Sequence, residues 1–426
     1  MPRPKIDLIY IDAGGGHRAA VNALEAVIRE QRRPWETRPR NIQDLLHSID
    51  VIRKLTGVPF QEVYNIMLRR GWTLGTAQLI PPMHLAIRIF HDAQVRALAA
   101  NWSQDPPDMV VSLIPHYNRA IKQALAQVCP AAALVTILTD IADYPPHFWI
   151  ERQDQYVICG STRAAAQARA LGYPECRILR TSGMILNPQF YAQLSLDRAA
   201  ERTRLGLRAD LPTALVSFGG QGSMDAVKVA RAIDRCRSDV QMIAICGRHQ
   251  EASRKLRAMR HRVPVHVVGF TTDVPFYMRL ADFFIGKPGP GSISEALAMR
   301  LPVIVERSAW TLAHERYNAD WIVEQQVGMV VNNFSRLGKA VAELLSPARY
   351  ERYRANAAAL KNSAVYEIPE LLARVLGGAD DRFMSSASAP QRRQTTKYDG
   401  LPLDRPIVRH SGGRAPKSAD QVSQDF

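Results

Sequence analysis

The segment Phe283–Glu295 has the sequence FFIGKPGPGSISE. Its apolar start predicts a short buried strand, Phe283–Ile285, and its end predicts a helix capped by Ser292. The loop between them alternates three glycines with two prolines, and a helix amino end behind such a loop is suited to hold phosphate. Glu295, one turn into the helix, is placed to accept hydrogen bonds from ribose hydroxyls. A capping-box role explains Glu295 alone but not the loop.

The same order of short apolar strand, loop and helix recurs along the chain, which predicts parallel βαβ units. We therefore expect an α/β fold with two Rossmann-like lobes, parallel sheets and a cleft between the lobes. The expected strands are Ile6–Ile11, Met109–Leu113, Leu134–Leu138 and Gln155–Ile158 in the first half, and Ala214–Phe218, Met242–Cys246, Val265–Val268, Phe283–Ile285 and Val303–Val305 in the second.

The length of 426 residues predicts two or three folding units. We expect an N-terminal lobe over 1–190 with a helical insertion over 43–100, and a nucleotide-sugar lobe over 191–345. A final pair of helices over 346–378 is expected to pack back towards the first lobe. The Ser-, Arg-, Pro- and Gly-rich segment 379–426 is expected to be a disordered tail.

The composition restricts the classes of partner. A formal charge of +15 favours anions, but the basic residues are scattered and form no nucleic-acid recognition module. The five cysteines are widely spaced and predict reduced core thiols rather than a disulfide or metal site. No apolar window reaches the roughly 20 residues of a membrane span, so any membrane contact is expected to be peripheral.

Two further glycine-rich turns follow predicted strands. Gly14, Gly15 and Gly16 precede His17 at the start of a predicted helix, where an imidazole can serve as a general base. A plain tight turn and a helix-capping histidine are the competing interpretations. The segment Phe218–Ser223, FGGQGS, opens the second lobe in the same way, and two such turns suit a diphosphate held between two lobes.

At this point the chain resembles a known family. The triple glycine with His17, the segments Thr139–Asp140 and Pro145–Trp149, and the loops Gly219–Ser223 and Gly286–Glu295 are similar to those of the monogalactosyldiacylglycerol synthases and processive diacylglycerol glucosyltransferases. A more distant similarity is to the peptidoglycan N-acetylglucosaminyltransferase. The resemblance covers about residues 5–375 and implies a GT-B fold, inverting chemistry, and no catalytic metal or other cofactor. The absence of an Asp-x-Asp triplet agrees with the last point.

The resemblance also implies roles for individual residues. His17 is the expected general base, and Asp140 is its fallback or its orienting partner, although Asp140 as a helix N-cap explains that residue equally well. Phe270 is expected against the base and Glu295 against the ribose. Glu315 and Asn318 match the second polar patch of the family, whereas their neighbours His314, Arg316 and Tyr317 depart from it. The expected donor-binding set is Gly15, Gly16, Gly219, Gly220, Ser223, Phe270, Gly289, Gly291, Ser292, Glu295, Glu315 and Asn318.

The insertion bears on the acceptor. It combines large apolar and aromatic side chains with cations, a composition suited to the headgroup zone of a membrane with anionic lipids. A helical subdomain that packs these residues inward is the alternative. The expected acceptor or membrane residues are Tyr64, Arg69, Arg70, Trp72 and Leu74.

These observations predict an inverting hexosyltransferase that moves galactose or glucose from a UDP-sugar to diacylglycerol. The product would be a β-linked glycolipid, formed by a peripheral enzyme on the cytoplasmic face of the cell membrane. A UDP-sugar epimerase of the same fold, a transferase for another lipid-linked acceptor, and an inactive binding protein are the alternatives. Nucleic acid is not an expected partner.

Overall fold

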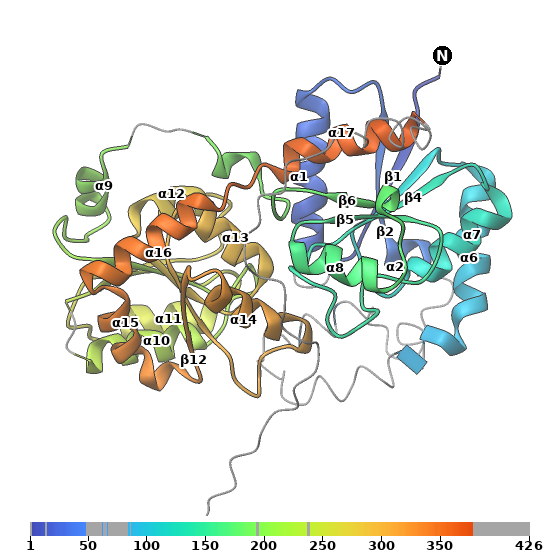
Figure 1. Cartoon of the computed structure of the whole chain (residues 1–426). Helices are drawn as coiled ribbons and strands as arrows, with labels where there is room; N and C mark the ends of the chain where they lie inside the picture. The colour runs from blue at the N-terminus through green and yellow to red at the C-terminus, as the bar shows by residue number, and fades with distance from the viewer. Residues whose placement is uncertain are drawn as a thin grey trace, which may run out of the picture. The chain divides into compact units, whose positions relative to one another are not determined.

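The computed structural model describes residues 2–12, 15–47, 62, 66, 84–85, 87–192, 196–236 and 239–377. Most of the expected insertion over 43–100 and the whole expected tail over 379–426 lie outside these residues. The described part forms two six-stranded sheets whose strands are all parallel, each flanked by helices (Figure 1). The expected α/β fold is confirmed.

The first sheet has the strand order β2-β1-β3-β4-β5-β6. Its strands are β1 (Lys5–Tyr10), β2 (Glu36–Asn41), β3 (Met109–Ser112), β4 (Ala133–Ile137), β5 (Tyr156–Cys159) and β6 (Ile178–Arg180). The helices that connect them are α1 (Gly16–Glu30), α2 (Ile42–Leu45), α6 (His91–Gln104), α7 (Asn118–Val128) and α8 (Thr162–Ala170).

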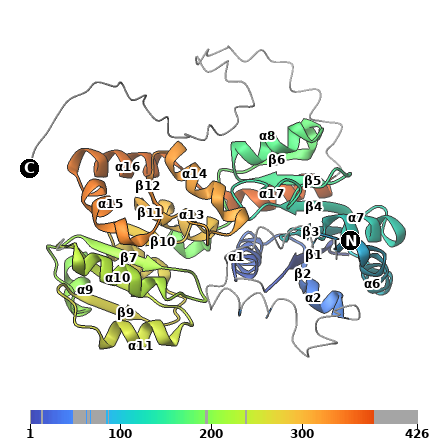
Figure 2. The same cartoon turned by 90° about the horizontal axis from the view of Figure 1, so that it is seen from below.

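The second sheet has the order β12-β11-β10-β7-β8-β9 (Figure 2). Its strands are β7 (Thr213–Ser217), β8 (Gln241–Ile245), β9 (Val265–Val268), β10 (Phe283–Gly286), β11 (Val303–Glu306) and β12 (Gly328–Val331). The helices are α9 (Arg198–Arg204), α10 (Asp225–Arg235), α11 (Gln250–Ala258), α12 (Val274–Leu280), α13 (Pro290–Ala298), α14 (Arg316–Glu324), α15 (Leu337–Leu344), α16 (Pro347–Ala359) and α17 (Ala364–Leu376).

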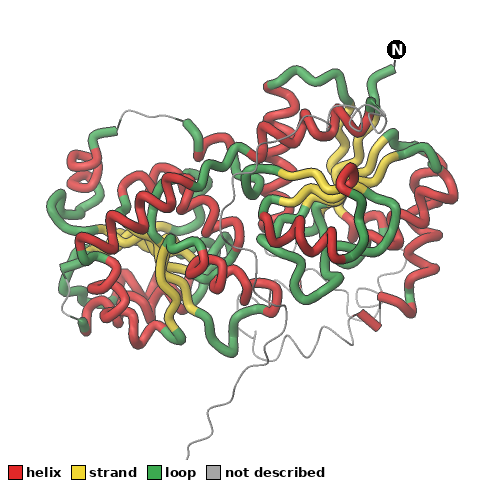
Figure 3. The backbone as a smooth tube through the Cα atoms, in the orientation of Figure 1, coloured by secondary structure: helices red, strands yellow, loops and turns green. Residues whose placement is uncertain are grey.

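Helices cover both faces of each sheet, so successive side chains of a strand enter different cores (Figure 3). In β1, Ile6 and Leu8 pack against α1 and α17, while Ile9 packs against α6 and α7. In β7, Ala214 and Val216 face α10 and α15, while Leu215 faces α13 and α14. This two-sided burial explains why the central strands are almost continuously apolar.

Three strands at the edges of the sheets were not expected from the sequence: β2, β6 and β12. The strand β2 is polar and contains Pro39, and its pairing with β1 is reinforced by side chains. Arg38 Nε donates to the fully buried Asp7 carboxylate at 2.6 Å, and Trp102 Nε1 donates to its other oxygen at 2.9 Å. An ion pair, rather than apolar alternation, therefore fixes this edge.

The C-terminal helices divide between the two cores. Tyr353 and Ala357 of α16 are buried in the cores of the second sheet. Ile368 and Leu372 of α17 are buried with α1 in a core of the first sheet. Gln31 at the end of α1 also donates to the Tyr366 carbonyl at 3.2 Å.

The chain therefore crosses twice between the sheets, and the two crossings are hydrogen-bonded to each other. Asn362 Nδ2 donates to the Met184 carbonyl at 3.0 Å, and the Ser363 amide donates to Ser182 Oγ at 2.7 Å. Gly183 lies against Asn362 so closely that a Cβ there would come within 2.6 Å of the amide carbon. We call residues 182–184 with 362–363 the paired crossing.

Candidate active site

The turn between β1 and α1 positions the first functional side chain. Gly15 is the N-cap of α1 with a φ of 88°, a left-handed conformation that favours glycine. No side chain caps this helix, so its first amides stay available to a ligand. Gly16 begins the helix and is exposed, while Gly14 lies outside the described residues.

His17 follows in the first turn of α1 and is half-buried. Its Nδ1 lies 3.2 Å from the Thr139 hydroxyl, and its ring centroid lies 5.9 Å from that of Trp149. Burial lowers the pKa of His17 to about 4, against a weaker raising effect of a hydrogen bond with the Leu113 backbone. The imidazole is therefore neutral at pH 7, the state in which it can accept a proton. The helix-capping interpretation is wrong, because Gly15 holds the cap position.

Asp140 is buried near His17, but its carboxylate accepts a hydrogen bond from Trp149 instead. Its Oδ2 accepts a hydrogen bond from Trp149 Nε1 at 2.8 Å, and it makes no hydrogen bond with His17. Burial raises the pKa of Asp140, while the nearby His314 and Lys287 act to lower it. Two expectations are corrected here. Asp140 neither orients His17 directly nor caps a helix, since the described helix that follows it begins at Thr162.

A group of histidines around Phe148 was missed by sequence reasoning. His116 packs edge-on against Phe148 at 4.2 Å, and His314 stacks on the same ring at 5.3 Å. Nε2 of His84 lies 3.1 Å from Nδ1 of His116. Burial, reinforced by the neighbouring histidines, lowers the pKa of His116 to about 3. Like His17, His116 comes just after a strand of the first sheet, and that position is the signal that could have revealed it.

The loop after β7 approaches other backbone segments closely. Gly219 and Gly222 have φ values of 79° and 73°, and a Cβ on Gly222 would lie 1.9 Å from the Cys246 carbonyl oxygen. Only glycine fits there. Ser223 is engaged locally, because its hydroxyl donates to Asp225 Oδ2 at 2.9 Å and accepts from the Asp225 amide.

Phe270 lies beside this loop. Its side chain is 54% exposed, which is unusual for a large aromatic, and the Arg248 guanidinium lies 4.4 Å from its ring centroid. A Cβ on Gly220 would be 4.0 Å from the Phe270 ring, so the ring borders the glycine loop. The exposed ring and the cation form a platform on which a flat base can stack. Arg248 had no role in the sequence analysis.

The loop after β10 leads into α13. The helix begins earlier than expected: Gly289 is the N-cap and Pro290 the first residue, so Ser292 lies inside the first turn and does not cap it. Proline at the first position lacks the amide hydrogen that would go unpaired there. No side chain caps α13, and Gly291 is exposed in open space, where an added Cβ would meet no atom within 4 Å. The amide groups of this turn are open to an anion.

Glu295 is half-buried on α13 and has no hydrogen bond or ion pair to a described residue. Burial raises its pKa to about 7. A capping-box glutamate would bond back to the N-cap, and Glu295 does not. An unpaired, partly desolvated carboxyl group one turn above a glycine loop is what a ribose hydroxyl would satisfy.

The second polar patch contacts the same loop. Lys287 Nζ donates to Glu315 Oε1 at 2.6 Å, and Glu315 is only 4% exposed. Asn318 Nδ2 donates to the Pro288 carbonyl at 2.8 Å, while its buried Oδ1 has no partner. A Cβ on Gly289 would lie 3.3 Å from Lys287 Cε, so the ammonium group sits beside the amino end of α13. Lys287 carried no assigned role in the sequence analysis.

The expected acceptor or membrane residues Tyr64, Arg69, Arg70, Trp72 and Leu74 lie outside the described residues. Next to them, residues 84–85 and 87–89 are helical. Leu85 and Ile89 are 58% and 68% exposed, and Arg88 is exposed beside them. In the part of the chain that the structure describes, no helix is long and apolar enough to cross a membrane. No cluster of three potential metal ligands occurs among the described side chains.

Comparison with known proteins finds a family model that matches part of the second half of the chain. Residues 213–372 match the model of the glycosyltransferase family 28 C-terminal domain. The chain is 26% identical over 372 residues to monogalactosyldiacylglycerol synthase 1, chloroplastic, of Arabidopsis thaliana, covering 82% of this chain and 66% of that protein. The chain thus spans about two thirds of the length of that relative.

Solved structures with the same fold belong to several proteins. Acinetobacter baumannii MurG matches with a TM-score of 0.57 at 13% identity, over 88% of this chain and all of that one. The UDP-GlcNAc 2-epimerase of Neisseria meningitidis, bound to UDP-GlcNAc, matches with a TM-score of 0.56 at 11% identity, over 88% and 100% of the two chains. At such identities the likeness shows the fold. The chain has a two-lobed GT-B fold, its residues 213–372 match the glycosyltransferase family 28 C-terminal domain, and its resemblance to the monogalactosyldiacylglycerol synthases is confirmed.

Proposed function

We propose that this protein is an inverting hexosyltransferase that moves galactose or glucose from a UDP-sugar to diacylglycerol. The observation that carries the proposal is the neutral, half-buried His17 in the first turn of the uncapped helix α1. Its neighbour Asp140 lies within the electrostatic reach of Lys287 and Glu315 from the opposing loop. A proton acceptor and an anion-binding loop are therefore close to each other. The names of the plant relatives supply the substrate classes.

In the proposed reaction, the acceptor hydroxyl oxygen attacks the anomeric carbon of the donor sugar. His17 takes the hydroxyl proton as the new C–O bond forms. The bond between the anomeric carbon and the β-phosphate oxygen breaks, and UDP leaves with the electron pair. Attack from the face opposite the leaving group inverts the configuration and gives a β-linked product.

The leaving diphosphate gains negative charge that the protein must stabilise. The uncapped amino end of α13 offers amide hydrogens and the positive end of a helix dipole. The Lys287 ammonium, held by Glu315 at 2.6 Å beside Gly289, supplies a full positive charge. These groups take the role that a divalent cation has in metal-dependent sugar transferases.

Donor recognition falls to residues of the second sheet. The exposed Phe270 ring under Arg248 provides a stacking surface for uracil. Glu295 is assigned to the ribose hydroxyls, and the unpartnered Oδ1 of Asn318 to a sugar hydroxyl. Neither the Glu295 carboxyl group nor Asn318 Oδ1 has a hydrogen-bond partner in the described protein. A hydrogen bond from a ligand hydroxyl would therefore offset the free-energy cost of leaving these polar atoms unsatisfied.

The acceptor is proposed to arrive from a membrane surface. Exposed Leu85 and Ile89 with Arg88 combine apolar and cationic character, as interfacial helices do. The residues that the sequence analysis expects at the acceptor or membrane, Tyr64, Arg69, Arg70, Trp72 and Leu74, belong to the same expected insertion and lie outside the described residues. We accordingly propose a peripheral location on the cytoplasmic face of the membrane, with anionic lipids as partners.

The test offers the purified protein radiolabelled UDP-galactose or UDP-glucose together with vesicles that contain diacylglycerol. We expect label in a lipid of monohexosyldiacylglycerol mobility, with one donor strongly preferred and a β-anomeric proton signal. His17→Ala serves as the inactive control. Vesicles that contain a polyprenyl phosphate in place of diacylglycerol separate this acceptor from other lipid-linked acceptors.

The same assay distinguishes the epimerase alternative, which the structural likeness to a UDP-GlcNAc 2-epimerase raises. Incubation of the protein with UDP-sugar alone would give an isomerised nucleotide sugar if that activity were present. An isomerised product without any labelled lipid would overturn the transferase proposal.

A further inference from the structure

A basic cavity lies on the second sheet, away from the glycine loops. Its volume is about 240 Å³, and its described lining includes Arg198, Arg279, Arg300, Arg354, Asp282 and Tyr350. Asp282 is the one acidic residue among the described residues that line it. We call this group of side chains the arginine cavity.

The arginine cavity opens at the amino edge of the sheet. Ala281 and Asp282 immediately precede β10, and Leu301 precedes β11. The candidate donor loops follow the carboxyl ends of the same strands. A four-residue strand such as β10 separates the two edges by about 13 Å. The cavity is therefore distinct from the candidate active site.

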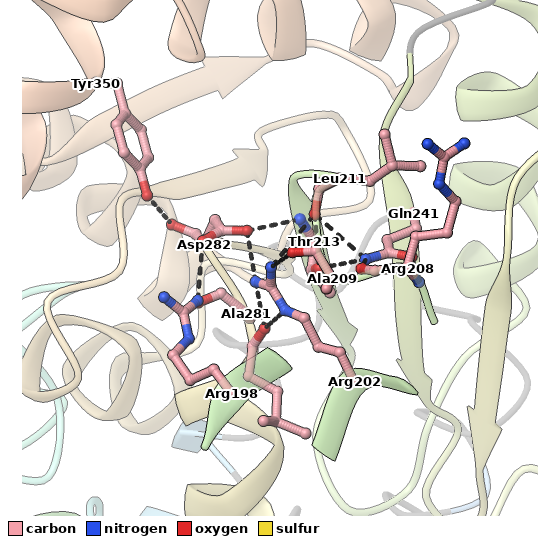
Figure 4. Close-up of polar contacts among 11 residues, drawn as sticks. Arg198, Arg202, Arg208, Ala209, Leu211, Thr213, Gln241, Ala281, Asp282 and Tyr350 are labelled. Atoms are coloured by element: carbon pink, nitrogen blue, oxygen red, sulfur yellow. Dashed lines mark hydrogen bonds and ion pairs between the residues drawn. The ribbon is translucent and has the colours of Figure 1, made fainter. Parts of the chain in front are cut away.

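The single carboxylate of the cavity is already neutralised. Asp282 accepts hydrogen bonds from Arg198 at 2.9 Å, Arg202 at 2.7 Å and the Thr213 amide at 2.8 Å (Figure 4). Its backbone carbonyl accepts from the Tyr350 hydroxyl at 3.2 Å. These bonds anchor Arg198 and Tyr350 at the wall of the cavity, and Asp282 makes no ion pair with Arg279, Arg300 or Arg354.

Arg300 and Arg354 form no ion pair with any described residue. The Arg354 guanidinium lies 5.6 Å from the Tyr350 ring, and Arg279 donates only to backbone carbonyls of Gln189 and Ala192. Several like charges gathered at one cavity repel one another unless an anion joins them. The surplus of positive charge is thus uncompensated by the described protein.

Arg300 also occupies an unusual backbone position. It follows α13 with a φ of 59°, and its amide bonds to the Leu297 carbonyl while the Leu301 amide bonds to the Ala296 carbonyl. This is a helix end of the Schellman type, where glycine is the favoured residue. The chain instead keeps a long cationic side chain that has no ion pair with a described partner.

We propose that the arginine cavity binds the phosphate group of an anionic ligand. Guanidinium groups bind phosphate oxygens in pairs of parallel hydrogen bonds, and Arg198, Arg300 and Arg354 approach the cavity from α9, the end of α13 and α16. The ligand is either a soluble phosphate or diphosphate compound or the headgroup of an anionic phospholipid. Both present the same chemistry to the arginines.

The soluble source is tested by calorimetric titration of the full-length protein and of its Lys287→Met variant with pyrophosphate. Lys287 belongs to the candidate donor site and does not line the arginine cavity, so pyrophosphate binding that persists in Lys287→Met reports a second site. Arg300→Gly removes the charge and places the favoured residue at a left-handed position, so the melting temperature should stay equal or rise. We expect it to weaken pyrophosphate binding about tenfold or more. Arg354→Gln should act in the same direction.

The control is Arg231→Gln, which removes an exposed arginine from α10 in the same half of the chain. Its pyrophosphate affinity should match that of the unaltered protein.

The lipid source is tested by flotation with vesicles that contain phosphatidic acid, compared with purely zwitterionic vesicles. Binding to the anionic vesicles that Arg300→Gly reduces, and Arg231→Gln does not, supports the site with a lipid headgroup as ligand.

The proposal is overturned if neither pyrophosphate nor the anionic vesicles distinguish Arg300→Gly and Arg354→Gln from Arg231→Gln. It does not depend on the proposed transferase activity. A protein without transferase activity that still loses pyrophosphate binding in Arg300→Gly would retain the arginine cavity as a phosphate site.

Discussion

His17 and Thr139 come from different strand ends of the first sheet and meet at 3.2 Å, imidazole to hydroxyl. This contact, rather than one with a carboxylate, holds the proposed base. His17→Ala should lower kcat by roughly 10²- to 10⁴-fold and leave the Kd for UDP nearly unchanged. Thr139→Val keeps the imidazole and should cause a smaller loss. If His17→Ala retained most of its turnover, the base would have to be reassigned to Asp140.

The lowered pKa of His17 predicts an unusual pH profile. Because burial lowers this pKa to about 4, the neutral form persists in the free protein down to that pH. In a Glu295→Gln background, which removes the titration of Glu295 near 7, we expect kcat/KM to hold its value as pH decreases from 7 to about 5 and to fall as it approaches 4. An acid limb centred near the ordinary histidine pKa of about 6.5 would contradict this prediction.

The same shift has a consequence for stability. Between about 4 and 6.5 the unfolded chain binds more protons at His17 than the folded chain, so the free energy of unfolding decreases as pH falls through this window. His17→Gln cannot be protonated and should lose less stability there. Denaturant titrations at pH 7 and pH 4.5 measure the difference between the two proteins.

The raised pKa of Glu295 predicts the opposite pH dependence of stability. Its folded pKa of about 7 exceeds its unfolded value, so its ionisation costs stability as pH rises from about 4.5 through 7. Glu295→Gln should therefore melt higher than the unaltered protein at pH 8 and nearly equally at pH 4.5. It should also weaken UDP binding by about 1–3 kcal/mol. A variant that lost stability at pH 8 would show that Glu295 has a structural partner.

Variants of the ion pair between Lys287 and Glu315 can separate the contribution of Lys287 to catalysis from its contribution to the stability of the fold. Lys287→Met should lower kcat by roughly 10²-fold through the loss of a charge beside the diphosphate, and it leaves a buried carboxylate unpaired. The double variant Lys287→Met/Glu315→Gln should recover most of the lost melting temperature. Its kcat should remain low. Recovery of activity together with stability would assign the pair a purely structural role.

Two exposed apolar side chains within the expected insertion, Leu85 and Ile89, predict membrane attachment. Leu85→Ser/Ile89→Ser removes two large exposed side chains and should weaken vesicle binding about tenfold. Val323→Ser, at a side chain 57% exposed on α14, is the matched control and should bind vesicles normally. Equal binding by all three proteins would remove Leu85 and Ile89 from the membrane surface.

The central strands could be predicted because helices cover both of their faces. Val110 and Val111 in β3 are each fully buried, on opposite sides of the sheet, so the apolar run is continuous and visible. Edge strands have no such constraint. Glu36–Asn41 pairs through backbone and an Arg38–Asp7 ion pair, and nothing in its composition distinguishes it from a loop.

The candidate site was predictable where glycine is physically required and less so elsewhere. Positive φ values at Gly15, Gly219 and Gly222 account for their places in the glycine-rich turns. Partners of charged groups depend on which loops meet in space. For that reason the pairing of His17 with Thr139, and the contact of His314 with Phe148, could not be derived from spacing along the chain.

The paired crossing determines how one half of the molecule can turn against the other. Since residues 182–184 and 362–363 are bonded side by side, rotation between the sheets must bend both segments at one place instead of at two independent linkers. Gly183 packs against the end of the Asn362 side chain, and a larger residue at position 183 would have to displace that side chain from its bond to the Met184 carbonyl. The outgoing and the returning chain are therefore held together as one double connection between the two sheets.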